Sequence, residues 1–328
     1  MKNRILYIDN LKAFAIFTVI VGHVFYFTWN HYSNNVWNYL IAAYNMPLFF
    51  FLSGMFAKDK MSFYQLIRKA KQLLLPTITL GGVYAFINDG ISELLFGGSH
   101  FGYWFLPTLF IMFAVFYLRC LLMAFLRDKM RLGERIILIA DVSYMFACWG
   151  IIKTLVNYMP ENIYNLFCLG NIANYILFFW LGFLSWHNKK RLANLIKANK
   201  DKIYALCFIL FSVLFYYGFY ISSDFRGYQH KILALLSIPV LILLFRQCDF
   251  GKGKIQTMLS YVGTHSLEIY VLQYFFLPSS YKLVSSISGG VNCLAISLIE
   301  SILTLLLCVV AVKVISVNKY LNLLFFGK

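Results

Sequence analysis

Four polar residues that could take part in chemistry lie inside long apolar segments: His23, Asn45, Glu268 and Glu300. An ionisable side chain is costly to bury in hydrocarbon, so at membrane depth it is a functional candidate by default. Counting 1.5 Å of rise per residue places all four about 17–21 Å from the cytoplasmic boundary of the hydrocarbon. Asp141 falls closer to that boundary. His23 exchanges a proton near neutral pH without special tuning, which makes it the candidate general base.

Each of these residues also has a structural interpretation. His23 could bond to a backbone carbonyl between helices, line a passive polar cavity, or relay protons in a transporter. Glu268 and Glu300 could form a pair that stabilises the interior of a helix bundle. The other histidines lie in loops or near segment ends and lack the spacing of a metal site. The seven cysteines are scattered and form no Cys-x-x-Cys pair, so we expect neither a metal site nor a disulfide framework.

Lys12 shares a helix face with His23. Lys12 precedes His23 by eleven positions, which correspond to three helical turns within about 20° and to roughly 16 Å along the axis. Asp9 precedes Lys12 by three residues on nearly the same face, where an ion pair with Lys12 is expected. A charged pair at one end of this face and an imidazole at mid-depth suit a channel. An anionic donor could be held at the mouth while its reactive end reaches His23.

The composition indicates that these segments cross a bilayer. Of 328 residues, 61% are hydrophobic, 19% aromatic and only 13% charged, whereas a soluble domain is about one quarter charged. The mean hydropathy of +0.71 agrees with this. So little polar surface excludes a water-soluble globule, a nucleic-acid-binding domain and a disordered chain.

Ten apolar stretches are long enough to cross the hydrocarbon, which needs about 20 residues. We therefore predict an all-α membrane protein, a polytopic bundle of about ten transmembrane helices forming one domain over residues 1–328. No cleavable signal peptide is expected. The predicted spans are 11–29, 39–57, 74–90, 103–126, 136–156, 172–187, 203–221, 231–246, 257–277 and 291–315.

The basic residues orient these spans. With ten spans, 25 of the 29 Lys and Arg residues fall on one side, as expected for short cytoplasmic loops. Both termini are therefore predicted to be cytoplasmic, and the net charge of +16 reflects topology rather than nucleic-acid binding. The amphipathic segment 58–73 carries Arg68, Lys69 and Lys71. It is expected to lie along the inner surface, either binding phosphate groups of a donor or only anchoring the chain to anionic lipid.

Five motifs, in this order, resemble the acyltransferase-3 family of integral membrane acyltransferases over about residues 4–316. The first, RILYIDNLKAFAIFTVIVGH, contains Lys12 and His23 at the family's spacing. Two departures stand out, because the family often has arginine at Lys12 and histidine at Gln273. No fused extracytoplasmic domain is expected, and members that resemble this shorter form include sugar O-acetyltransferases such as fucose acetylases. The remaining motifs are NMPLFFFLSGMF (45–56), IRKAKQLLLP (67–76), YWFLPTLF (103–110) and SLEIYVLQ (266–273).

The resemblance implies transfer of an acyl group, usually acetyl, from cytoplasmic acyl-CoA to a hydroxyl of a cell-surface glycan or lipid-linked sugar. It implies a multi-pass protein of the cell membrane, with acyl-CoA, a carbohydrate acceptor and the bilayer as partners. The residue spacing described above adds the expectation that no metal is bound. A proton-coupled exporter of polysaccharide or lipid-linked sugar is the competing hypothesis, and a scaffold without activity is a third.

Roles can be assigned to the candidate residues on this basis. His23 is the expected general base, although an acyl-histidine intermediate stays open. Glu268 or Glu300 could orient the imidazole, and Asn45 could donate to the developing oxyanion. The expected donor-binding residues are Lys12, Asp9, Arg68, Lys69 and Lys71.

Overall fold

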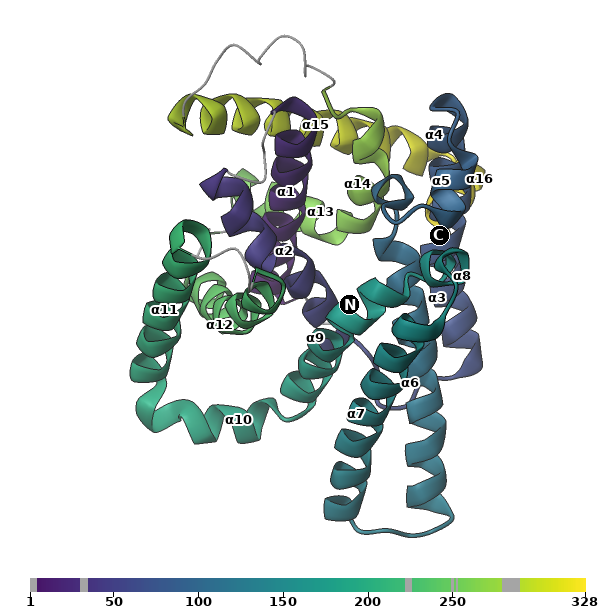
Figure 1. Cartoon of the computed structure of the whole chain (residues 1–328), viewed down its shortest axis with the longest axis vertical. Helices are drawn as coiled ribbons and strands as arrows, with labels where there is room; N and C mark the ends of the chain where they lie inside the picture. The colour runs from purple at the N-terminus through teal and green to yellow at the C-terminus, as the bar shows by residue number, and fades with distance from the viewer. Residues whose placement is uncertain (1–4, 30–34, 222–225, 249–250, 252, 279–289) are drawn as a thin grey trace. The chain divides into compact units, whose positions relative to one another are not determined.

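The computed structural model describes residues 5–29, 35–221, 226–248, 251, 253–278 and 290–328. Within these ranges the chain is helical and contains no strand (Figure 1). The longer helices are α1 (Leu6–Thr28), α2 (Val36–Met55), α3 (Phe63–Pro76), α6 (Phe105–Asp128), α7 (Glu134–Tyr158), α9 (Leu169–His187), α11 (Lys200–Tyr216), α12 (Arg226–Gln247), α13 (Lys254–Thr264) and α15 (Gly290–Val317). The shorter ones are α4 (Gly82–Ile87), α5 (Ile91–Phe96), α8 (Glu161–Leu166), α10 (Lys189–Ile196), α14 (Ser266–Leu272) and α16 (Lys319–Phe326).

Eight helical segments of the described chain are long and apolar enough to cross a membrane. The all-helical membrane class is thus confirmed, whereas the count of ten and the cytoplasmic placement of the termini stay predictions. Two predicted spans are not among the eight: α2, and the segment 257–277. The eight are Leu6–Thr28, Phe63–Ile87, Phe105–Asp128, Glu134–Tyr158, Glu161–His187, Lys200–Ile221, Gln229–Gln247 and Cys293–Val317.

Segment 257–277 is not one continuous helix. α13 ends at Thr264, His265 has φ −107° and ψ 22°, and α14 then runs from Ser266 to Leu272. A 3₁₀ turn, η6 (Gln273–Phe275), follows directly. Hydropathy does not register such breaks, because the apolar pattern continues through them. The break matters for the site, since it changes which side chains face α1.

The amphipathic segment 58–73 is mostly helix. Ser62 caps α3 and forms a capping box with Gln65, which satisfies two backbone N–H groups at the helix start. α3 continues through a π-helical turn (Thr77–Gly81) into α4. The predicted third span therefore begins inside a longer helical segment.

The described residues form two compact units, whose boundaries fall within α2, directly after α9, and within α15. One unit contains the chain up to Phe49 and Asn188–Val314, and the other contains Phe50–His187 and Ile315–Lys328. All the residues proposed above for catalysis belong to the first unit.

In the first unit, α1 packs closely against α13. The side-chain amides of Asn10 and Gln256 bond reciprocally, with N···O distances of 3.0 and 2.8 Å, and both residues are buried. A Cβ atom at Gly263 would overlap the backbone carbonyl of Asp9. Glycine therefore permits this close approach, and the amide pair fixes its register.

Gly263→Ala is expected to destabilise the protein by roughly 1–3 kcal/mol, because the added methyl group forces α1 and α13 apart. Gly150→Ala is the matched control, since no atom lies within 4 Å of a Cβ at that position in α7. Thermal unfolding of the purified protein in detergent measures both. An unchanged melting temperature for Gly263→Ala would contradict the close approach.

In the second unit, glycines let α2 and α9 cross closely. A Cβ at Gly54 would overlap the carbonyl oxygen of Phe179, and a Cβ at Gly182 would overlap that of Phe51. Small residues at such crossings let helix backbones approach in a membrane. Gly54 and Gly182 therefore permit the close crossing of α2 and α9.

Candidate active site

His23 lies on α1 beside η6, the turn in which α14 ends. Its ring centroid is 5.2 Å from that of Tyr274, with an interplanar angle of 40°. The side chain of Gln273 interacts with the same imidazole. Gln273 is completely buried, whereas His23 is partly exposed. Because η6 is a tight 3₁₀ turn, two consecutive residues of one segment lie next to His23.

Polar atoms without hydrogen-bond partners are concentrated at this point. Nδ1 of His23 and both Nε2 and Oε1 of Gln273 are buried and have no partner within the described ranges. A buried polar atom left unpaired costs about 1–3 kcal/mol and calls for an explanation. An acceptor for Nδ1–H of His23 would fix the neutral tautomer in which Nε2 carries a lone pair, and Gln273 is the amide that interacts with this imidazole.

Glu300 contacts a different side of α1. Its Oε2 accepts a hydrogen bond of 2.9 Å from Oγ1 of Thr28. Thr28 follows His23 by five residues, which corresponds to a rotation of about 140° around the helix. The neighbouring bond from Trp29 Nε1 to Ser297 Oγ, 2.8 Å long, also joins α15 to the end of α1. This contact of Glu300 holds two helices together, and its predicted role in orienting His23 stays a prediction.

Glu268 and Asn45 are buried in the same unit as His23. Glu268, on α14, is 2% exposed, and Asn45, on α2, is 8% exposed. The carboxylate of Glu268 acts electrostatically on Tyr261, one element earlier in the chain. Oδ1 of Asn45 is buried without a hydrogen-bond partner in the described part of the chain. Their expected roles, orienting the imidazole and donating to an oxyanion, stay predictions.

The predicted donor-binding residues belong to both units. Lys12 and Asp9 are partly buried on α1, which is continuous from Leu6 to Thr28. The predicted common face of Lys12 and His23 follows from that continuity. Arg68, Lys69 and Lys71 lie on α3 in the second unit.

The three α3 residues differ in their surroundings. The ammonium group of Lys69 lies 4.5 Å from the centre of the Phe113 ring. This cation–π contact partly satisfies the charge of Lys69 within the protein. Arg68 and Lys71 are exposed. Binding of a donor by these residues stays a prediction.

Two features of the molecule were not assigned from the sequence. Gln273 was noted there only as a departure from a family pattern, not as a neighbour of His23. Arg119, counted only among the basic residues of the cytoplasmic side, is buried in α6 and bonded to Asp141 and Asp59. A polar residue at the end of the apolar run SLEIYVLQ was the available signal for Gln273. Within the described residues, no cluster of three or more His, Cys, Asp or Glu side chains could hold a metal ion.

A family model described as an acyltransferase domain matches residues 5–317, nearly the whole chain. The chain belongs to the acyltransferase-3 family. The matched range includes α1 with His23 and the α14–η6 segment with Gln273. Comparisons with curated proteins and with solved structures found no match. The protein is therefore a membrane acyltransferase.

Proposed function

We propose that the protein transfers an acyl group, most simply acetyl, from cytoplasmic acyl-CoA to a hydroxyl of a cell-surface glycan or its lipid-linked precursor. The observation that carries the proposal is the His23–Gln273 pair on two helical segments of a membrane acyltransferase. A partly exposed imidazole with a buried, unpaired Nδ1 suits a general base whose other nitrogen faces a substrate. The multi-pass protein is expected in the cell membrane, with its basic loops on the donor side.

The proposed reaction needs one base and one set of oxyanion donors. Nε2 of His23 takes the proton of the acceptor hydroxyl as that oxygen attacks the thioester carbonyl. The tetrahedral intermediate collapses, the C–S bond breaks, and the leaving CoA sulfur receives the proton from the imidazolium. The amide of Asn45 is assigned to the oxyanion, and Glu268 to the electrostatics of the imidazolium. Lys12 and Asp9 are assigned to the donor entrance on the same α1 face.

The proposal is tested by asking whether the protein forms a covalent ester bond on the glycan. The full chain is reconstituted in liposomes with radiolabelled acetyl-CoA and a glycan acceptor, and both free CoA thiol and labelled glycan are measured. Equal amounts of released thiol and ester-linked label are expected. An exporter would move the glycan across the bilayer without adding label, and that result would replace this proposal.

Gln273 is proposed as a positioning residue that acts through His23. Gln273→Leu is expected to lower kcat about 10-fold, because no side-chain amide would then be available to accept from Nδ1–H of His23, with little change in KM for the donor. Gln273→His, which restores a ring nitrogen as acceptor, is expected to retain most activity.

The pH profile of kcat distinguishes positioning from packing. Losing the acceptor changes the proton affinity of His23, so the Gln273→Leu profile should be displaced along the pH axis. A purely structural role would lower the rate equally at every pH. Such a uniform loss would remove Gln273 from the mechanism.

A further inference from the structure

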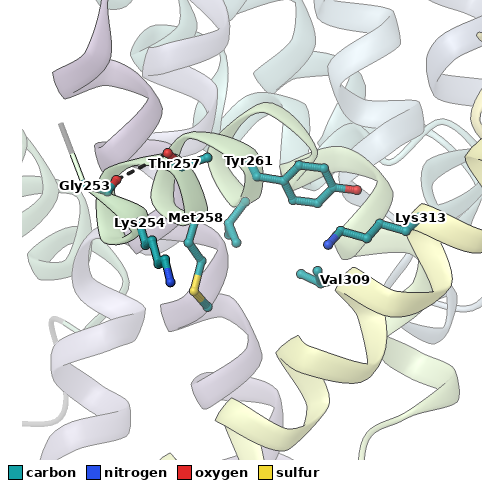
Figure 2. A pocket seen from close by; sticks show the side chains of 8 residues that line it. Gly253, Lys254, Thr257, Met258, Tyr261, Val309 and Lys313 are labelled. Atoms are coloured by element: carbon teal, nitrogen blue, oxygen red, sulfur yellow. Dashed lines mark hydrogen bonds between the residues drawn. The ribbon is translucent and has the colours of Figure 1, made fainter.

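A groove of about 590 Å³ lies between α13 and α15, in the same unit as His23 (Figure 2). Its polar lining residues are Lys254, Thr257 and Tyr261 from α13 and Lys313 from α15. Figure 2 shows the two lysine side chains reaching into the gap between the helices, with Met258 and Val309 between them. The groove therefore has apolar side chains between two cationic groups, and these two groups come from separate helices.

The groove is positively charged. Lys254 and Lys313 are exposed, and none of the eight lining residues is Asp or Glu. The ammonium group of Lys313 lies 5.5 Å from the centre of the Tyr261 ring, so the ring holds it at the wall of the groove. Gly253, at the start of α13, provides no side-chain cap, which leaves first-turn N–H groups that also favour an anion. The buried Glu268 acts on Tyr261 from the α14 side.

The position of the groove relates it to His23. Gln256, beside the groove residue Thr257, bonds to Asn10 near the start of α1. His23 lies thirteen residues further along α1, about 20 Å away. The elements α13, α14 and η6 follow one another along the chain. The first lines the groove and the last contacts His23. An elongated ligand with phosphate groups at one end and a reactive group at the other matches this separation.

We propose that this groove binds the phosphate groups of the acyl-CoA donor, with Lys254 and Lys313 as the charged contacts. The inference rests on the proposed function and extends it to residues outside the set predicted from sequence. The basic-residue count predicts the same side for these two lysines as for Lys12. The pantetheine arm would then extend along α14 toward His23. A phosphate group of an anionic lipid is the alternative source of the same chemistry.

The experiment measures donor binding directly. The full chain is reconstituted in phosphatidylcholine vesicles, and binding of CoA and of dephospho-CoA is titrated without turnover. Removing both charges, in the double variant Lys254→Gln with Lys313→Gln, is expected to weaken CoA binding on the order of 10-fold or more. The corresponding arginine double variant should retain binding. Lys319→Gln, an exposed charge on α16, is the matched control and should bind CoA normally.

The outcomes separate this inference from the proposed function. Normal CoA binding by the glutamine double variant overturns the groove assignment, even if the wild-type protein transfers acetyl groups. Weakened CoA binding supports the groove even if no acceptor is ever acylated, which would refute the proposed function alone. A wild-type protein that binds no CoA overturns both. Phosphatidylglycerol, an anionic lipid, can be added to the vesicles. If the variant binds CoA normally but no longer responds to phosphatidylglycerol as the wild-type protein does, the groove binds lipid and the assignment is wrong.

Discussion

Replacing His23 by alanine is expected to lower kcat for acyl transfer by about 10²- to 10⁴-fold, because the attacking hydroxyl loses its base. The structure makes this residue the centre of the site. It lies beside Gln273 and Tyr274, and its buried Nδ1 has no partner within the described chain. Substrate binding uses other groups, so KM for the donor should change little.

The measurement compares reconstituted wild-type and variant proteins at equal abundance, using labelled acetyl-CoA and a glycan acceptor. His230→Ala is the matched control, because His230 is a partly buried histidine of the same unit that packs 4.7 Å from the Tyr39 ring. An equal loss of acyl transfer in both variants would indicate disturbed packing rather than the loss of a catalytic group. Undiminished transfer by His23→Ala would remove the residue from the chemistry.

The same variant distinguishes general-base catalysis from a pathway with a covalent acyl-histidine intermediate. If His23 acts as a nucleophile, wild-type protein mixed with labelled donor alone becomes labelled before the acceptor is added. A general base leaves the protein unlabelled under those conditions. His23→Ala shows whether any such label requires this ring.

The sequence predicted the parts of the fold that depend on local composition. Long apolar runs specify membrane helices because backbone groups must be satisfied within each segment. The shared face of Lys12 and His23 follows from helix geometry alone. Close approach at Gly54 also follows from residue type, since only glycine lacks a Cβ.

Features that depend on tertiary contacts could not be predicted in this way. The break at His265 and the turn at Gln273 both fall inside one predicted span, and the turn itself, Gln273–Phe275, contains no glycine or proline. The proximity of Gln273 to His23 joins residues 250 positions apart, a pairing that no local pattern encodes. Glu300 was placed correctly inside a helix, but its contact with Thr28 could be found only from the packing of α15 on α1.

Arg119 shows the same limit in the second unit. From the sequence, Arg119 is counted among the basic residues of the cytoplasmic side, near the end of the predicted span 103–126, and Asp141 lies near the edge of a span. In the structure Nε of Arg119 donates to Asp141 at 2.8 Å, Nη2 donates to the other carboxylate oxygen, and Nη1 donates to Asp59. Rings of Phe116 and Phe183 lie against the guanidinium, at 5.5 and 4.7 Å. The network ties α6 to α7 and to the segment before α3.

Arg119→Met is expected to destabilise the protein by about 3–5 kcal/mol, because it leaves the carboxylate of Asp141 buried without a counter-charge. The side chains of Arg119 and Asp141 are only 4% and 6% exposed. Replacing both members, Arg119→Met with Asp141→Leu, should recover most of the loss, since no buried charge remains. Arg127→Met is the control. Its side chain is 42% exposed, and its Nη1 lies 3.7 Å from a carboxylate oxygen of Asp59, so a change below about 1 kcal/mol is expected.

The pH dependence of unfolding tests the Asp59 part of this network. Burial alone would raise the pKa of Asp59, but hydrogen bonding to Arg119 and the charges of Arg119, Arg127 and His187 hold that pKa below its usual range. A carboxyl with a lowered folded-state pKa stabilises the fold above its unfolded pKa and loses this contribution as the pH falls through the folded value. Detergent-induced unfolding between neutral and acidic pH should therefore show a steeper acid loss for wild-type protein than for Arg119→Met. Parallel curves would show that Arg119 does not set the ionisation of Asp59.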